Sequence, residues 1–198
     1  MRELILKMHV SIDGFVGSPD GGIKWVFGND QQAKTWTVET VWNASLHIMG
    51  SRTFHAMAAH WPTSTEVFAP PMNQIPKAVF SRQGPAILQT INTAAQPAER
   101  QPGANSWTQA YVAAGNLAEE ITKLKARDGK PIIAHGGAGF ARSLTAQGHV
   151  DQYDLLVHPV ALGKGLPIFS DLAAPLSLKL VSSKAFPGGA VAQIYRPA

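Results

Sequence analysis

The sequence contains no cysteine among its 198 residues. A disulfide framework, a thiolate nucleophile and a cysteine-ligated zinc site are therefore excluded. No apolar run approaches the length of a membrane span, and charged residues interrupt the amino-terminal segment where a signal peptide would have its apolar region. We therefore expect a cytoplasmic protein with no membrane partner.

Charge is also sparse. Charged residues make up 15% of the chain, and its 17 basic and 13 acidic residues are scattered without a block of one sign. The net charge of +4 suits an anionic small molecule. Nucleic-acid binding usually requires a concentrated basic face, so no nucleic-acid partner is expected. Hydrophobic residues reach 45%, which predicts a sizeable core in a single domain over residues 1–198.

The histidines do not form a metal-binding pattern. The sequence has seven of them, and none is placed in a His-x-x-x-His pair. We predict no metal site and assign each histidine a structural or surface role.

Strand-like and helix-like segments alternate along the chain. Strands are expected over residues 4–10, 46–49, 110–113, 132–134 and 152–157, and helices from about residue 30 to 44, from residue 50, from 116 and from 140 to 148. This alternation predicts an α/β fold with a mostly parallel sheet covered by helices on both faces. Residues 176–181 and 191–195 are predicted to close it as an antiparallel pair. Residues 83–106 are predicted to be an irregular insertion, in which 86–91 would form a short strand or hairpin arm.

Two segments are predicted to pass from a strand through glycine into a helix. One is Gly136-Gly137-Ala138-Gly139-Phe140, and the other is Gly50-Ser51-Arg52-Thr53-Phe54. Such junctions direct backbone N–H groups outward at the positive end of a helix dipole, where a phosphate binds well. A purely structural turn accounts equally well for the first segment. The second adds a guanidinium and a hydroxyl, which suit a phosphate monoester.

Asp13 and Trp25 are candidates for the substrate side. Asp13 ends the first strand, and ligands of open α/β sheets gather at such carboxyl ends. It could instead accept local backbone hydrogen bonds in an Asx-turn. Trp25 could floor a pocket for a flat heterocycle, or it could fill the core.

Several short motifs follow one another along nearly the whole chain. They are Met8-x-x-Ser11-x-Asp13-Gly14-Phe15, Ile48-Met49-Gly50-x-Arg52-Thr53-Phe54, Val79-Phe80-Ser81-Arg82, the Gly136-Gly137 turn, Val150-Asp151, and His158-Pro159-Val160-x-Leu162-Gly163-x-Gly165. In this order they resemble the dihydrofolate-reductase-like superfamily, and most of all the reductase domain of the bifunctional deaminase-reductase of riboflavin biosynthesis and its stand-alone relatives. The Cys/His/Glu set of a zinc deaminase is missing, so the resemblance implies reductase activity only.

The resemblance implies a three-layer dihydrofolate-reductase-like fold that binds NADPH across the carboxyl edge of the sheet. Gly50, Arg52 and Thr53 match the cap that holds the pyrophosphate and the adenosine-side phosphate. Ser81 and Arg82 match the position that reads the 2′-phosphate, and the segment from Gly136 through Gly137, Ala138 and Gly139 to Phe140 matches the second pyrophosphate cap. Relatives in the riboflavin-type branch pair with a second copy, so a homodimer is expected.

The implied reaction is hydride transfer from NADPH to a small heterocyclic or sugar-linked imine or carbonyl, of the 5-amino-6-(5-phosphoribosylamino)uracil reductase type. Asp13 matches the aspartate that faces the substrate there, and we assign it substrate polarisation or proton relay. Two alternatives stay open. One is a non-catalytic nucleotide-binding or regulatory module. The other is dihydrofolate reductase proper, in which the first helix carries an acid where this chain has Lys34, with Asp30 and Glu39 out of register.

Overall fold

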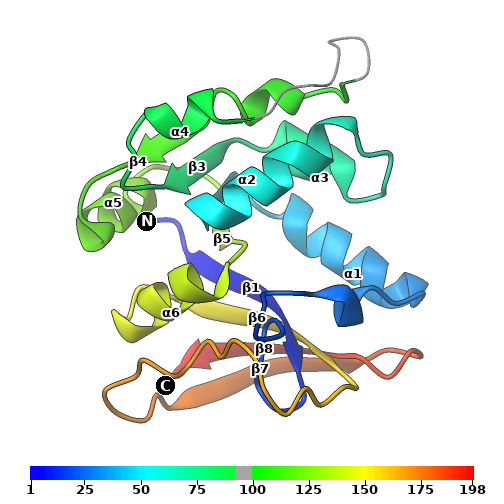
Figure 1. Cartoon of the computed structure of the whole chain (residues 1–198). Coiled ribbons are helices and arrows are strands. Elements are labelled where there is room, and N and C mark those ends of the chain that lie inside the picture. Colours follow the sequence, from blue (N-terminus) through cyan, green and yellow to red (C-terminus); the bar gives the residue numbers. More distant parts are fainter. Residues whose placement is uncertain (92–99) are drawn as a thin grey trace. The chain divides into compact units, whose positions relative to one another are not determined.

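The computed structural model describes residues 1–91 and 100–198. Eight strands lie in the described residues, namely β1 (Leu4–Ser11), β2 (Leu46–Gly50), β3 (Lys77–Phe80), β4 (Tyr111–Ala113), β5 (Ile132–Ala134), β6 (Gln152–His158), β7 (Leu178–Ala185) and β8 (Val191–Pro197) (Figure 1). The α-helices of the same residues are α1 (Gln31–Trp42), α2 (Ser51–His60), α3 (Ala69–Gln74), α4 (Ala86–Gln89), α5 (Leu117–Lys125) and α6 (Ala138–Ala146).

The chain divides into two compact units. The first comprises Met1–Arg2 and Val38–Ile133, and the second comprises Glu3–Thr37 and Ala134–Ala198. Strands of the first unit follow the order β4-β3-β2, with parallel pairing throughout. Strands of the second follow the order β1-β6-β8-β7, with β1 and β6 parallel and the last two pairs antiparallel. The mostly parallel pairing and the closing antiparallel pair confirm the predicted α/β class.

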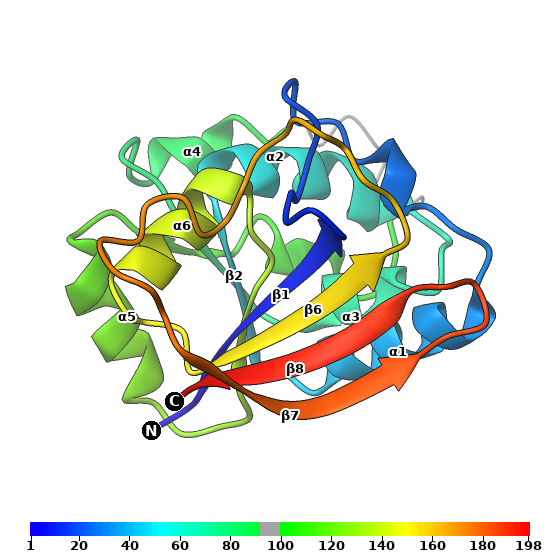
Figure 2. The ribbon, with the colours of Figure 1, turned by 90° about the horizontal axis from the view of Figure 1, so that it is seen from below.

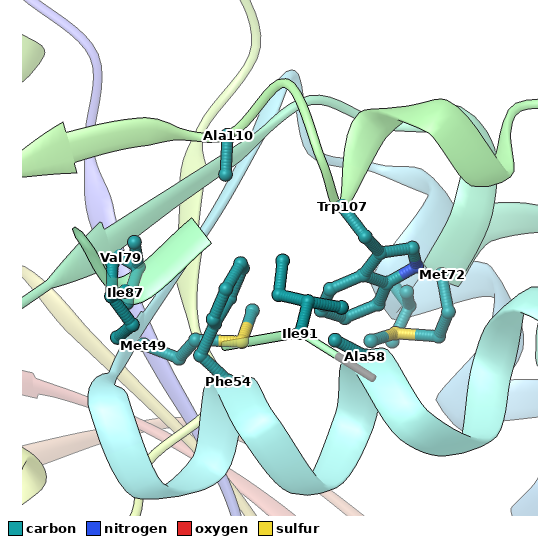
Figure 3. Packing of buried hydrophobic residues seen from close by; sticks show 10 residues of the cluster. Met49, Phe54, Ala58, Met72, Val79, Ile87, Ile91, Trp107 and Ala110 are labelled. Carbon is teal, nitrogen blue, oxygen red and sulfur yellow. The ribbon is translucent and has the colours of Figure 1, made fainter. Parts of the chain in front are cut away.

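The first unit is built on a large aromatic and aliphatic cluster. Phe54 and Ala58 are four residues apart on α2, so both point to the same side, where they meet Met49 of β2 and Val79 of β3 (Figure 3). The Phe54 ring lies 5.8 Å from that of Trp107, centroid to centroid. Each of these side chains is almost completely buried, and burial of one large apolar side chain stabilises a fold by about 1.5–3 kcal/mol.

In the second unit, β1, β6, β8 and β7 lie side by side (Figure 2). Asp30 connects the first helix to the β7–β8 turn. One carboxylate oxygen accepts hydrogen bonds from the N–H groups of Gln32 (2.9 Å) and Ala33 (3.0 Å), and the other accepts from the N–H of Gly188. Asp30 thus caps this helix, which was expected to start at about residue 30.

Two short helices differ from the sequence-based expectation. Residues 86–91 were predicted to be a strand or hairpin arm, but Ala86–Gln89 form α4 and bury Ile87. The prediction was wrong because Pro85, in a helical conformation, starts the helix at its N-cap. Helix α3 was not predicted, since Pro70 and Pro71 suggest a break, although proline is tolerated in a first helical turn. Of the predicted insertion, residues 92–99 lie outside the described residues.

In residues 1–91 and 100–198, the structure contains no helix with both the length and the apolar character needed to cross a bilayer.

Candidate functional site

The junction of β2 and α2 has the geometry expected of a phosphate-binding helix start. Gly50 is both the last residue of β2 and the N-cap of α2, with φ −76° and ψ 163°, and no side chain of the described residues caps the helix. The first N–H groups of an α-helix have no acceptor within the helix and lie at the positive end of the helix dipole. Arg52 is exposed and Thr53 half-buried on that first turn. The junction can therefore receive an anion.

The next strand ends at the same edge. In the parallel pair of β2 and β3, Gly50 is the register partner of Phe80, so Ser81 and Arg82 follow directly beside the β2–α2 junction. Ser81 is buried. Its N–H donates to the carbonyl of Ala113 (3.1 Å), and its hydroxyl accepts from the N–H of Gln83 (3.1 Å). Arg82 extends outward, exposed.

The side chains of Arg52 and Arg82 form no hydrogen bond or ion pair with any other described residue. Two uncommitted guanidinium groups thus start from adjoining strand ends of one unit. Guanidinium groups bind phosphate oxygens in a bidentate manner. The residues of this edge therefore fit the phosphorylated end of a dinucleotide.

The glycine turn before α6 belongs to the second unit. Gly136 has φ +77°, and a Cβ added there would lie 2.8 Å from Sδ of Met8 on β1. Gly136 thus has a structural reason to be glycine. Gly137 is the N-cap of α6, whose first residue is Ala138, and a Cβ added to Gly139 would meet nothing within 4 Å. A purely structural turn therefore explains the glycine at position 136. In contrast, Gly139 is exposed and Phe140 is half-buried.

The Asp13 side chain is an anchor between two loops. It is exposed and accepts hydrogen bonds from the hydroxyl of Ser11 (2.5 Å) and from the N–H groups of Gly163 (2.7 Å) and Leu162 (3.1 Å). The bond from Ser11, followed by the backbone bonds, lowers the pKa of Asp13 below its ordinary value. Asp13 is therefore a carboxylate with no proton to donate.

The loops that Asp13 joins also pair through their backbones. The N–H of Val16 donates to the carbonyl of Leu166 (2.9 Å), and the N–H of Leu166 donates to the carbonyl of Gly17 (2.8 Å). A Cβ added to Gly165 would lie only 2.4 Å from the carbonyl oxygen of Gly17. We call the segments 12–17 and 160–167 the paired loops.

Trp25 lies on a short 3-10 turn (Lys24–Val26) and is half-buried. Its ring meets the ring of His158 edge-on, with 5.5 Å between centroids. His158 is in turn hydrogen-bonded to His9, with Nδ1 of His9 and Nε2 of His158 2.8 Å apart. Sequence reasoning missed this pair because the two residues are 149 positions apart. The available signal was that each histidine lies near the carboxyl end of an expected strand.

The described residues contain no cluster of three or more histidine, aspartate or glutamate side chains that could hold a metal ion.

Comparisons with known proteins place this arrangement in a family. The chain is 27% identical over 194 residues to the uncharacterized protein YyaP of Bacillus subtilis, covering 98% of this chain and 94% of that protein. The deaminase/5-amino-6-(5-phosphoribosylamino)uracil reductase of Thermotoga maritima has a similar fold, with a TM-score of 0.69 and 18% identity over all of this chain and 57% of the other. Dihydrofolate reductase of Enterococcus faecalis, complexed with NADP(H), gives a TM-score of 0.62 and 12% identity over 98% and 96% of the two chains.

These likenesses confirm the dihydrofolate-reductase-like fold. The model of the RibD C-terminal domain matches residues 2–192. The chain therefore belongs to the RibD C-terminal domain family.

Proposed function

We propose that this protein is an NADPH-dependent reductase that transfers a hydride to a small heterocyclic or sugar-linked imine or carbonyl, of the 5-amino-6-(5-phosphoribosylamino)uracil reductase type. The observation that carries the proposal is the register of β2 and β3. It brings the helix start at Gly50 and the residues Ser81 and Arg82 to one edge. Membership of the RibD C-terminal domain family supports reductase chemistry.

The chain's own residues have distinct tasks in this proposal. The first-turn N–H groups of α2, with Arg52 and Thr53, bind a phosphate, and Arg82 beside Ser81 binds the 2′-phosphate that distinguishes NADPH from NADH. The turn from Gly136 to Phe140 binds the pyrophosphate at the start of α6. Bound NADPH would supply the hydride, while the protein orients the acceptor and provides a proton. Asp13 and Trp25 are proposed to contact the substrate, with the Asp13 carboxylate polarising it.

Dihydrofolate reduction is less well supported than this reaction. Asp30 uses its carboxylate to cap α1 and to hold Gly188, so it is committed to the fold. Glu39 is exposed, and Lys34 occupies the expected position of the acid. The alternative is a non-catalytic module that retains the NADPH cleft. A measurement of turnover distinguishes it from the proposed reductase, because such a module would bind NADPH without oxidising it.

We test the cofactor first. Dissociation constants of NADPH and NADH are measured by fluorescence titration on the unmodified protein, Arg52→Ala, Arg82→Ala and the control Arg127→Ala, an exposed arginine after the carboxyl end of α5. A charge-assisted bond contributes about 1.5–3 kcal/mol, so each of the first two variants should weaken NADPH binding by about tenfold or more. Arg82→Ala should weaken the binding of NADH less than that of NADPH. Equal affinities for NADPH and NADH in the unmodified protein would reject the assignment.

Turnover is tested by NADPH oxidation across a panel of pyrimidine, pterin and carbonyl acceptors. Oxidation that depends on a ribosylaminopyrimidine supports the proposed reaction, and oxidation with dihydrofolate alone supports the alternative enzyme. Tight NADPH binding without oxidation by any acceptor would favour the non-catalytic module.

We also propose that the protein is a homodimer that pairs through β7 and β8. Among the strands of the described residues, β7 has a neighbour only in β8, and all the residues of β7 except Leu178 are exposed. An exposed strand edge of this kind is a template for pairing with another chain.

A further inference from the structure

The pair His9 and His158 lies at the carboxyl ends of two neighbouring parallel strands. His158 is the last residue of β6 and is the register partner of Ser11, the last residue of β1, while His9 is two residues earlier on β1. The rings are stacked, with centroids 5.1 Å apart and 27° between their planes. His158 is therefore nearer to the edge where Asp13 and the paired loops begin.

The contact between the two ring nitrogens determines which nitrogens of the pair carry protons. Nδ1 of His9 and Nε2 of His158 are 2.8 Å apart, so one of them carries a proton and the other accepts it. If the rings are neutral, the shared proton forces the two outer nitrogens, Nε2 of His9 and Nδ1 of His158, into opposite states. One outer nitrogen then carries a proton and the other is bare. Neither outer nitrogen is hydrogen-bonded to another described residue, nor is either among the buried unpartnered atoms.

Burial, together with the surrounding charges, keeps the pair neutral at pH 7. Burial is the largest effect that lowers the pKa of His9, followed by the charges of Lys7, His158 and His135. The pKa of His158 is lowered by burial and by Lys7.

Lys7 is itself buried next to Asp154 of β6 and lies 5.8 Å from the Trp36 ring of α1. Its pKa falls to about 8 through burial, opposed by Asp154. The pKa of Asp154 is raised by burial, opposed by the hydrogen bond from Gln152 and by the charges of Lys7 and Arg196. Lys7 is the one of these groups that acts on both histidines, and its positive charge adds to burial in disfavouring an imidazolium.

We infer that His158 is the catalytic residue that gives the proton completing the reduction, and that His9 is the positioning residue that holds its tautomer and resupplies it. The inference rests on the proposed reductase function and deepens it. Asp13 cannot supply this proton because it is already ionised. Trp25 packs against His158, which brings the predicted substrate contact and the proton donor together.

The step balances in atoms and charge. A hydride adds to the electrophilic carbon of the C=N or C=O group, and the π electron pair moves onto its nitrogen or oxygen. That atom takes the proton from Nδ1 of His158. The shared proton passes from Nδ1 of His9 to Nε2 of His158, and Nε2 of His9 takes up a proton from solvent. The acceptor gains one hydride and one proton, and the pair ends neutral.

Two substitutions test the role of the outer nitrogens independently of the hydrogen bond between the two residues. His158→Gln places an amide near the position of Nε2, so it can keep the contact with His9 while removing the outer nitrogen. His9→Asn places an amide near Nδ1 and likewise removes only Nε2. His60→Gln is the control, because His60 is an exposed residue at the end of α2 that bonds Glu66.

The first measurement is nitrogen-15 NMR of the imidazoles in the cofactor-free protein between pH 6 and 8. We expect both rings to be neutral at pH 7 and locked in complementary tautomers, and His9→Asn to release the tautomer of His158. Two rings that titrate independently near pH 6.5, or that keep their tautomers in the single variants, would overturn the inference.

The second measurement is turnover with an active acceptor, with thermal unfolding as a check of folding. His158→Gln should lower kcat by about a hundredfold or more and leave the dissociation constant of NADPH unchanged. His9→Asn should lower kcat less and reduce the solvent isotope effect, and His60→Gln should match the unmodified protein. If the unmodified protein turns over and both paired variants equal it, the inference fails and the proposed function stands. If none of the tested acceptors supports NADPH oxidation by the unmodified protein, the inference and the proposed function fail together.

Discussion

Single side chains in this protein are held by interactions that the sequence does not reveal. Asp13 shows this clearly, because two of its three hydrogen-bond donors, Leu162 and Gly163, are about 150 residues away. The prediction that Asp13 lies at the ligand edge of the sheet does not require these bonds. They limit its chemistry, since a carboxylate that accepts three hydrogen bonds stays ionised.

We predict that Asp13→Asn lowers turnover by roughly tenfold to a hundredfold and leaves NADPH affinity unchanged. Asparagine has one acceptor oxygen instead of two, so it cannot hold Leu162 and Gly163 in the same way, and a small misplacement of reacting groups has a large effect on rate. Turnover, the NADPH dissociation constant and hydrogen exchange of residues 160–167 are the measurements. Unchanged turnover with faster exchange would limit Asp13 to holding the loop.

Lys77 permits a pH prediction because its side chain is 2% exposed and no acid pairs with it in the described residues. Its ammonium donates to the carbonyl of Ile75 and to Ser106 and lies 4.8 Å from the Trp107 ring. Burial lowers its pKa from 10.5 to about 7. Between these values the unfolded chain binds more protons than the folded chain, so the free energy of unfolding rises with pH.

Lys77 contributes at most about 1.4 kcal/mol per pH unit to the slope of the free energy of unfolding against pH. Lys77→Met should remove the Lys77 contribution and leave that of Lys7, whose pKa is about 8, while Lys179→Met, at an exposed lysine of β7, should keep the full rise. Urea unfolding of the three proteins from pH 6.5 to 9.5 provides the comparison. Parallel curves for Lys77→Met and the unmodified protein would show that Lys77 titrates normally.

At the scale of elements, α5 is the helix that local rules describe best. The Asn116 side chain accepts hydrogen bonds from the N–H groups of Ala118 (2.9 Å) and Glu119 (3.4 Å), so it caps the helix that was expected to start at residue 116. Asn116→Ala should lower the free energy of unfolding by about 0.5–2 kcal/mol. Asn116→Asp should retain most of the stabilisation that the cap provides. Equilibrium denaturation decides this, and an alanine variant as stable as the unmodified protein would show that the cap contributes nothing.

The elements that sequence reasoning found, and those it missed, differ in how local their causes are. Helices α1, α5 and α6 have their caps or stop signals within a few residues, so they were predictable. Helix α4 is four residues long and is held by burial of Ile87 in a cluster with residues such as Trp107, which periodicity does not detect. The strand ends carrying Arg52 and Arg82 were predicted from motif order. The His9–His158 contact was not, since only the β1–β6 pairing creates it.

At the scale of the whole molecule, the prediction concerns assembly. Leu180 and Val181 on β7 are 50% and 54% exposed, and the proposed dimer would cover them. Light scattering at micromolar concentration should give the mass of a dimer. Leu180→Lys should shift it toward the monomer because a charge would then be buried at the interface. Lys179→Ala should not.

A monomer mass for the unmodified protein would contradict the assembly. A dimer that survives Leu180→Lys would place the interface elsewhere on the chain.

The paired loops also bear on how this protein can be re-engineered. Segments 12–17 and 160–167 share backbone hydrogen bonds, the Asp13 carboxylate and the close approach of Gly165 to Gly17. A loop grafted from a relative at only one of these places would lose its backbone partners and would place a side chain against Gly17 if it lacked glycine at position 165. Chimeras that exchange substrate preference should therefore transfer the two segments together, as one cassette.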